Sequence, residues 1–330
     1  MSLLEVRNLD ISFRSTKNSI KVVSGVSFTI EEGEVFGLVG ESGCGKTLTA
    51  LSIMGILPQN AFAEGDIIFK GHNLLTLDKE SMRKLRGKEL SMIFQEPMTS
   101  LNPVLTVGYQ VAEVLTTHKG LSRKEAMSET IELFKAVRIP SPETRVREYP
   151  HQMSGGMRQR VMIAMAIACK PSLVIADEPT TALDVTIQAQ IIELLQRLKE
   201  EMKMAVLLIT HDLGIVAENA KTVAIMYAGR LMELVDVHTL FHDPKHPYTM
   251  GLLESLPKEK GIPLKPIPGF VPEPYRLPPG CKFSDRCRFV IHECKEREPE
   301  LIQTPNSELQ TPNSLHLVRC IRAEEISWKS

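Results

Sequence analysis

Apolar residues alternate with polar ones at the start of the chain and later gather in short continuous runs. Between residues 4 and 13, and again between 22 and 30, apolar side chains recur at about every second position, which predicts strands of an antiparallel sheet. Four later runs are almost wholly apolar: residues 35–39, 91–94, 173–176 and 206–209. Strands that helices cover on both faces show such runs, so these segments predict a parallel sheet.

Helical patterns lie between these strands. Ser122 is followed three residues later by Glu125, a capping-box pattern that predicts a helix from there to about Val137. After Asp184, apolar residues recur at spacings of three and four as far as Met202, which predicts an amphipathic helix. Together the patterns predict an α/β fold with an antiparallel segment at its front.

Proline content changes near residue 240. Ten of the 21 prolines fall between Pro244 and Pro279. Proline lacks a backbone N–H and fixes φ, so this segment is expected to be extended, with little regular structure. We therefore predict a main domain over residues 1–240 and a small extension over residues 241–330.

The charge balance and the lack of long apolar segments narrow the function. The 39 basic and 40 acidic side chains give a net charge of −1, so no overall field attracts nucleic acid, and no nucleic-acid partner is expected. No segment reaches the roughly 18 consecutive apolar residues that span a bilayer, and the N-terminus does not resemble a signal peptide. We expect a cytoplasmic chain that reaches a membrane only through partners, with its six cysteines as thiols or metal ligands.

Residues 40–47, Gly-Glu-Ser-Gly-Cys-Gly-Lys-Thr, match the P-loop pattern, with an apolar strand before them and a helical segment after them. Backbone N–H groups of such a loop surround phosphate at the N-terminus of a helix, where the dipole favours anions. Lys46 is expected to reach the β- and γ-phosphates, and the Thr47 hydroxyl to bind Mg²⁺. The expected nucleotide contacts in this segment are Gly40, Ser42, Gly43, Cys44, Gly45, Lys46, Thr47 and Leu48.

Asp177 and Glu178 form an acidic pair directly after a predicted apolar strand. The C-terminal ends of parallel strands are where ligands of such sheets bind. An acidic pair alone is more simply interpreted as a helix cap, but a P-loop in the same chain favours a catalytic role. We predict that Asp177 is a partner of Mg²⁺ and that Glu178 polarises the attacking water.

Residues 151–160, His-Gln-Met-Ser-Gly-Gly-Met-Arg-Gln-Arg, resemble the signature motif of ABC ATPases, with methionines where the family usually has Leu and Gln. Gln95 resembles the Q-loop glutamine, the Thr-Ala-Leu-Asp segment at 181–184 resembles the D-loop, and His211 resembles the switch histidine. Phe13 matches the adenine-stacking aromatic position, although a strand Phe is equally well interpreted as a core residue. The resemblance covers about residues 3–240.

This resemblance implies a P-loop NTPase of ABC type, with a parallel-sheet core, an antiparallel β subdomain and a helical subdomain. It implies an ATPase that uses ATP and Mg²⁺, with Lys46, Glu178 and His211 as catalytic residues and Gln95 as a further Mg²⁺ ligand. A second ATPase subunit is expected to complete the site. The residues assigned to nucleotide contact by this resemblance are Phe13, Gln95, Ser154, Gly155, Gly156 and Asp184.

The tail resembles one group within this family. His-Pro-Tyr-Thr at 246–249 and Leu-Pro-Pro-Gly-Cys-Lys-Phe at 277–283 resemble a segment found after the ATPase domain in oligopeptide, dipeptide and nickel importers. This implies peptide import, two membrane permease subunits, an extracytoplasmic substrate-binding protein and a peripheral position on the cytoplasmic face of the membrane. Nickel or another small solute stays open as the cargo.

Four cysteines crowd the tail with the spacing C-x5-C-x6-C-x25-C: Cys281, Cys287, Cys294 and Cys320. Four thiolates suit either zinc or an iron–sulfur cluster. The C-x2-C pairs of structural zinc sites are missing, and the resemblance to dipeptide-importer ATPases favours a [4Fe-4S] cluster. Zinc and unliganded reduced thiols stay open.

The sequence disfavours three rival functions. A non-transport ABC ATPase of DNA repair or translation would carry a coiled coil, a second cassette or basic insertions, and the sequence shows none of them. A GTPase-like switch would need an Asn-Lys-x-Asp motif, which the sequence lacks. A cassette that binds ATP without cleaving it is disfavoured because Glu178 and His211 are both present.

Overall fold

The computed structural model describes residues 2–14, 19–181, 183–256, 266–304 and 315–328. The chain forms two compact units, and each is described here by itself. The first unit comprises Glu31–Glu34 and Thr76–Ile209, and the second comprises Ser2–Ile30, Val35–Leu75 and Thr210–Ser330. Residues on both sides of position 240 belong to the second unit, so a domain boundary at that position stays a prediction.

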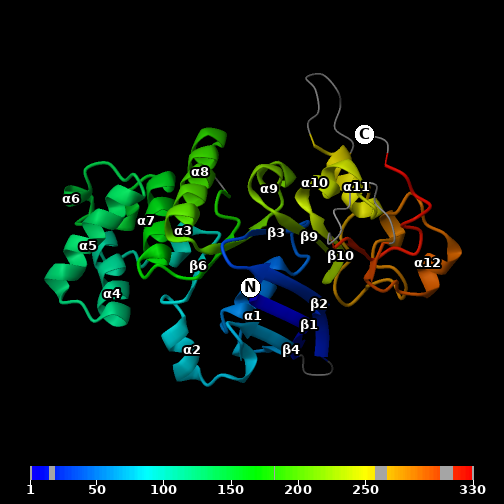
Figure 1. Cartoon of the computed structure of the whole chain (residues 1–330), viewed down its shortest axis with the longest axis horizontal. Coiled ribbons are helices and arrows are strands. Elements are labelled where there is room, and N and C mark those ends of the chain that lie inside the picture. Colours follow the sequence, from blue (N-terminus) through cyan, green and yellow to red (C-terminus); the bar gives the residue numbers. More distant parts are fainter. Residues whose placement is uncertain (1, 15–18, 182, 257–265, 305–314, 329–330) are drawn as a thin grey trace. The chain divides into compact units, whose positions relative to one another are not determined.

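The second unit contains a four-stranded sheet with the order β2-β1-β4-β5 (Figure 1). Its strands are β1 (Ser2–Arg14), β2 (Ser19–Glu31), β4 (Ala61–Phe69) and β5 (His72–Asn73). β1 pairs antiparallel with β4, with Leu4 opposite Phe69 and a register shift between Arg7 and Asp10. The antiparallel strands predicted from the alternating pattern are confirmed.

A second set of strands in this unit carries the candidate P-loop. Its members, in order of pairing, are β3 (Val35–Val39), β9 (Thr222–Tyr227), β10 (Arg230–Asp236), β12 (Leu317–Val318) and β11 (Ile302–Gln303). β3 is parallel to β9, and the later pairs are antiparallel. All five residues of β3 are buried, as its apolar run predicted. The helices α1 (Lys46–Ile53) and α9 (Leu213–Asn219) belong to the same unit, and a Cβ on Gly37 of β3 would lie 2.9 Å from Val216 of α9.

The tail has more regular structure than its prolines predicted. Its helical elements are α10 (Val237–His242), α11 (Pro247–Glu254), η3 (Ser284–Arg286) and α12 (His292–Glu296). Pro247 is the first residue of α11, where a missing N–H costs no hydrogen bond. The His246 ring caps this helix by accepting the Tyr248 N–H at 3.0 Å. Proline therefore starts a helix here instead of preventing one.

The first unit contains three parallel strands, β6 (Leu90–Ile93), β7 (Leu173–Asp177) and β8 (Ala205–Thr210). Ile93 lies opposite Ala176, and Asp177 lies opposite Ile209. Every residue of β7 and β8 is buried, as expected for strands that are covered on both faces. The parallel strands predicted from the unbroken apolar runs are confirmed.

Helices make up most of the rest of the first unit, and Figure 1 shows α4 to α7 gathered together. Its helical elements are α2 (Lys79–Leu85), α3 (Pro97–Ser100), α4 (Val107–Lys119), α5 (Arg123–Ala136), α6 (Pro142–Arg145), η2 (Pro150–Gln152), α7 (Gly155–Ile167) and α8 (Val185–Met202), and η1 (Leu74–Thr76) contains the last residues of Val35–Leu75 and the first of Thr76–Ile209. Leu115 of α4 and Ala126 of α5 are fully buried in one apolar cluster with Ala168. Within the ranges described above, no helix combines the length and apolar character needed to cross a membrane.

The capping box predicted at Ser122 is confirmed. The Ser122 N–H donates to the Glu125 carboxylate at 2.9 Å, and the Glu125 N–H donates to the Ser122 hydroxyl at 3.4 Å. The helix ends at Ala136, close to the predicted end. These two hydrogen bonds satisfy N–H groups that the first turn of a helix cannot pair internally.

Replacing Ser122 with Ala should lower the free energy of unfolding by about 1 kcal/mol, because the cap is lost. Ser128→Ala is the matched control, since Ser128 is exposed within the same helix and Ala favours a helix interior. Urea unfolding followed by circular dichroism measures both variants. Equal midpoints for the two would show that the cap does not stabilise the protein.

Candidate functional site

The loop of residues 40–47 joins β3 to α1, and two of its glycines have no substitute. A Cβ on Gly40 would lie 2.1 Å from the Met226 carbonyl oxygen. Gly45 caps α1 with φ of 107°, a conformation that residues with a side chain rarely adopt. Close packing against β9 at one end and the turn into α1 at the other therefore fix the glycine pattern.

Lys46 is buried and its ammonium lies over the loop itself. Its Nζ donates to the carbonyl oxygens of Gly40 at 2.7 Å and Glu41 at 3.2 Å. Ser42, Gly43 and Thr47 are exposed, while Leu48 is half-buried. The outer side of the loop is thus open to a ligand, with a cation directly behind it.

Cys44 lies on the inner side of this loop. Its side chain is fully buried, and burial raises the pKa of its thiol. The Cys44 carbonyl accepts the Gly229 N–H at 3.0 Å. The side chain therefore helps to pack the loop, and only its backbone is suited to a phosphate contact.

The predicted acidic pair lies at the end of β7. Asp177 is buried, and Glu178 is half-buried with φ of 45°. The Glu178 N–H donates to the Ile209 carbonyl of β8 at 2.9 Å, which holds the residue in this left-handed conformation. Such strained backbone is often found at functional sites, where surrounding contacts maintain it.

Two side chains orient the Glu178 carboxylate. Gln95 Nε2 donates to Glu178 Oε2 at 3.0 Å, and the Thr181 hydroxyl donates to the same oxygen at 2.9 Å. The structure thus brings together Gln95 and Glu178, which are 83 residues apart and were both predicted site residues. Thr181 was not predicted as a site residue, although a hydroxyl three residues after the acidic pair is a signal that could have indicated it.

The segment that resembles the signature motif forms the start of α7. Ser154 caps this helix, and its hydroxyl accepts the Met157 N–H at 3.3 Å. Ser154 and Gly155 are exposed, whereas a Cβ on Gly156 would lie 2.9 Å from Ile187 of α8. The motif therefore exposes a helix N-terminus, which favours anions, and its last glycine lets two helices pack closely.

For three further predicted site residues, the structure gives the position but does not test the predicted role. Asp184 caps α8 by accepting the Ile187 N–H at 3.0 Å. Phe13 is half-buried on β1 opposite Ala61, close to residues 15–18, which lie outside the described residues. His211 is exposed directly after β8. Ala182 of the D-loop segment also lies outside the described residues.

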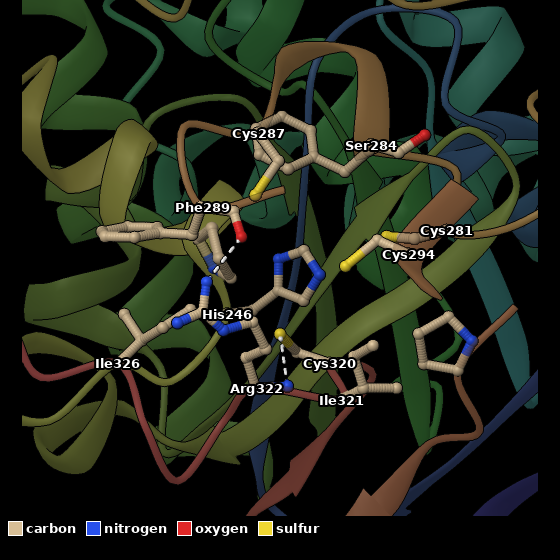
Figure 2. Close-up of a pocket in the computed structure, with 13 residues that line it drawn as sticks. His246, Cys281, Ser284, Cys287, Phe289, Cys294, Cys320, Ile321, Arg322 and Ile326 are labelled. Carbon is tan, nitrogen blue, oxygen red and sulfur yellow. Dashed lines mark hydrogen bonds between the residues drawn. The ribbon is translucent and has the colours of Figure 1, made fainter. Parts of the chain in front are cut away.

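The four tail cysteines line one pocket, and Figure 2 shows their sulfurs around the same space as the His246 ring. All four are free thiols, and burial raises the pKa of Cys281 to about 11 and that of Cys320 to about 12. Metal binding would therefore have to release protons from them. Among the described residues, no three His, Cys, Asp or Glu side chains are arranged to hold a metal ion.

Known proteins are similar to this chain over nearly its whole length. The sequence profile of the ABC transporter family matches residues 23–181, and that of the oligopeptide/dipeptide transporter C-terminal region matches residues 232–294. A dipeptide transport ATP-binding protein of Haemophilus influenzae is 50% identical over 91% of this chain and 92% of its own length. The protein of that description from Bacillus subtilis is 49% identical over 94% of this chain and 93% of its own.

The chain belongs to the ABC transporter family. It is an ABC ATPase with the C-terminal region of the oligopeptide and dipeptide transporters, and ATP with Mg²⁺ is the substrate of such enzymes. A solved dimeric ATP-binding cassette in a post-hydrolysis state with ADP and Pi has a TM-score of 0.63 and 27% identity, covering 71% of this chain and 98% of that chain. A subunit of an ABC transporter complex from Clostridium perfringens has a TM-score of 0.61 and 26% identity, covering 73% and 90%. The predicted P-loop fold of ABC type is confirmed.

Thr181→Val should lower the kcat of this ABC ATPase about tenfold and leave KM for ATP nearly unchanged, because a charge-assisted hydrogen bond to Glu178 is lost. Thr181→Ser keeps the hydroxyl and should retain most of the activity. Steady-state ATPase kinetics distinguish the two variants. Equal kcat values for Val and Ser would mean that the hydroxyl does not orient Glu178.

Proposed function

We propose that this ABC ATPase hydrolyses ATP at Glu178 and powers the import of peptides through a membrane transporter. The observation that carries the catalytic assignment is the Glu178 carboxylate held by Gln95 and Thr181 at the end of β7. Peptide transport is supported by the C-terminal region and by the dipeptide transport proteins that are about half identical to this chain.

The proposed roles of the nucleotide-site residues follow from the negative charge of the phosphates and the positive charge of Mg²⁺. Lys46 and the N–H groups of the loop bind the phosphates of ATP, while Thr47, Asp177 and Gln95 hold Mg²⁺. Bound Mg²⁺ neutralises part of the phosphate charge. Glu178 accepts a proton from the attacking water, and His211 stabilises the γ-phosphate as it transfers.

A second ATPase subunit completes the site in this proposal. Ser154 and Gly155 are exposed at the start of a 13-residue helix, so their N–H groups are available to a phosphate bound by another subunit. The similar cassette that was solved with ADP and Pi is a dimer, which supports the presence of a second ATPase subunit. ATP between the subunits then holds them together, and hydrolysis lets them separate.

The membrane partners are proposed to bind near the Q-loop. Residues 94–109 expose several large apolar side chains: Phe94, Met98, Val104 and Tyr109. Exposed apolar residues mark a protein-binding surface where they lie together in one patch. We assign this surface to a cytoplasmic helix of a permease subunit, of which the transporter has two. An extracytoplasmic binding protein delivers the peptide, and the ATPase is peripheral on the cytoplasmic face of the membrane.

Glu178→Gln should leave Mg-ATP binding intact and reduce turnover about 100-fold or more, because the amide cannot accept the proton of the water. The variant should accumulate a dimer in the presence of ATP. Calorimetry, phosphate release and size-exclusion chromatography measure these three properties. Turnover at the wild-type rate would remove Glu178 from its role as the base, and a wild-type chain that binds no Mg-ATP would refute the ATPase assignment.

The cysteine pocket is proposed to hold a [4Fe-4S] cluster, with zinc as the alternative. Four sulfurs around one zinc ion lie roughly 3.8 Å apart, because Zn–S bonds are about 2.3 Å long. In a cluster each cysteine binds a different iron atom, so the sulfurs lie farther apart. The four cysteines line one pocket, which supports a common site for one such group, and the resemblance of the tail to dipeptide-importer ATPases favours the cluster.

Protein purified without oxygen should be brown and contain about four iron atoms per chain. Cys294→Ser should lose this iron, whereas Cys169→Ser, a control outside the pocket, should keep it. Elemental analysis and the visible absorption spectrum measure both variants. One equivalent of zinc with no iron would establish the alternative, and iron loss in both variants would contradict a site in the pocket.

A further inference from the structure

The C-terminal segment holds Glu41, the second residue of the phosphate loop, by its backbone and by its side chain. The Glu41 N–H donates to the Tyr248 hydroxyl at 3.0 Å. Arg286 binds the Glu41 carboxylate with two hydrogen bonds, from Nη1 at 2.6 Å and Nη2 at 3.0 Å. Two-point pairing of guanidinium and carboxylate is among the stronger and more directional of side-chain interactions.

Other contacts fix Arg286 in this position. Its side chain is only 6% exposed, and its Nε donates to the Pro268 carbonyl at 2.8 Å. Its guanidinium lies 5.6 Å from the ring centre of Tyr227 and 6.0 Å from that of Phe283. A guanidinium held by rings and a carbonyl loses little further freedom when it binds a carboxylate.

Tyr248 belongs to the same aromatic group. Its ring centre lies 4.7 Å from that of Tyr227 and 5.3 Å from that of Phe283. Burial raises the pKa of the Tyr248 phenol, so the hydroxyl stays protonated while its oxygen accepts the Glu41 N–H. The residues that hold Glu41 thus form one packed cluster.

Glu41 connects this cluster to the phosphate-binding lysine. The Glu41 carbonyl accepts from Lys46 Nζ at 3.2 Å, so a shift of Glu41 would also move a group that holds the lysine. A carboxylate in this loop would repel bound phosphates unless a cation compensates its charge. Arg286 supplies that cation.

We propose that Arg286 is a positioning residue for ATP binding: it neutralises Glu41 and fixes the phosphate loop. The part of the tail that carries Arg286 and lines the cysteine pocket therefore sets the affinity for ATP. This rests on the proposed function, because it assumes that the loop binds ATP. Arg286 is the last residue of η3 and directly precedes Cys287, while Ser284 of the same turn lines the cysteine pocket. What the pocket holds therefore bears on the position of Arg286.

The first experiment compares the Kd for Mg-ATP of the full chain and two variants by calorimetry. Arg286→Met should weaken binding about tenfold, because the Glu41 carboxylate is left uncompensated. Arg288→Met is the matched control and should bind like the wild type. Arg288 lies two residues away and pairs with Glu254 of the tail at 2.6 Å, not with the phosphate loop.

A second substitution tests the reason for the loss. Glu41→Gln removes the uncompensated charge, so the double variant Glu41→Gln/Arg286→Met should bind ATP several-fold more tightly than Arg286→Met alone. A purely structural role of Arg286 would give no such recovery. Thermal unfolding of each variant checks that the chain is folded.

The role of the cysteine pocket is tested with the variant Cys294→Ser. Cys294 lines the pocket but belongs to α12, a different segment of the chain from the one that carries Arg286. Cys294→Ser alone should raise the Kd for Mg-ATP. In the Arg286→Met background the same substitution should change this Kd less than twofold. An unchanged Kd for Arg286→Met, no recovery in the double variant, or additive effects of Cys294→Ser and Arg286→Met would each overturn the proposal. A wild-type chain that binds no Mg-ATP would instead refute the proposed function.

Discussion

A carboxylate in a phosphate-binding loop repels the ligand that the loop is assigned to bind, unless a cation lies close to that carboxylate. Glu41 is such a residue, and Arg286 is its cation, with Lys46 held by the Glu41 carbonyl on the other side. Because Arg286 and Glu41 are 245 residues apart in sequence, the charge of the loop is balanced only when the tail is folded. The C-terminal region therefore belongs to the same compact unit as the loop and contacts it directly.

Local sequence patterns predicted the elements that depend on local physics. The capping box at Ser122 and the apolar spacing after Asp184 gave two helices whose starts are correct, because caps and helix faces are set by neighbours three and four residues apart. The apolar runs predicted β3, β6, β7 and β8, because a strand that is buried on both faces needs apolar side chains at consecutive positions. β12 was not predicted, since Leu317 and Val318 pair with Leu234 and Glu233 across more than eighty residues.

The residues of the candidate site also fall into two groups, those that a short stretch of sequence reveals and those that only the fold brings into place. The P-loop and the signature segment were recognisable because their chemistry lies within eight to ten consecutive residues. Thr181 and Arg286 were not, because each acts through a residue whose position only the fold reveals: Thr181 through the Glu178 carboxylate and Arg286 through Glu41. The cysteines are an intermediate case, since their number suggested a common site while the long gap before Cys320 left its place open. The pairing of β12 with β10, and the Arg319 N–H bonded to the Met232 carbonyl at 2.8 Å, carry Cys320 to the pocket.

Glu233 explains how a segment rich in proline keeps its position beside β10. This buried carboxylate accepts the backbone N–H groups of Lys245 at 2.8 Å and His246 at 3.0 Å, and lies 2.7 Å from the His316 ring. One side chain thus joins the start of α11 to the residue before β12. Removing a partner from such a group would leave buried charge uncompensated, so these contacts favour a single arrangement of the tail. Tyr248 lies two residues beyond His246, so the anchor that fixes the tail also places the hydroxyl that holds Glu41.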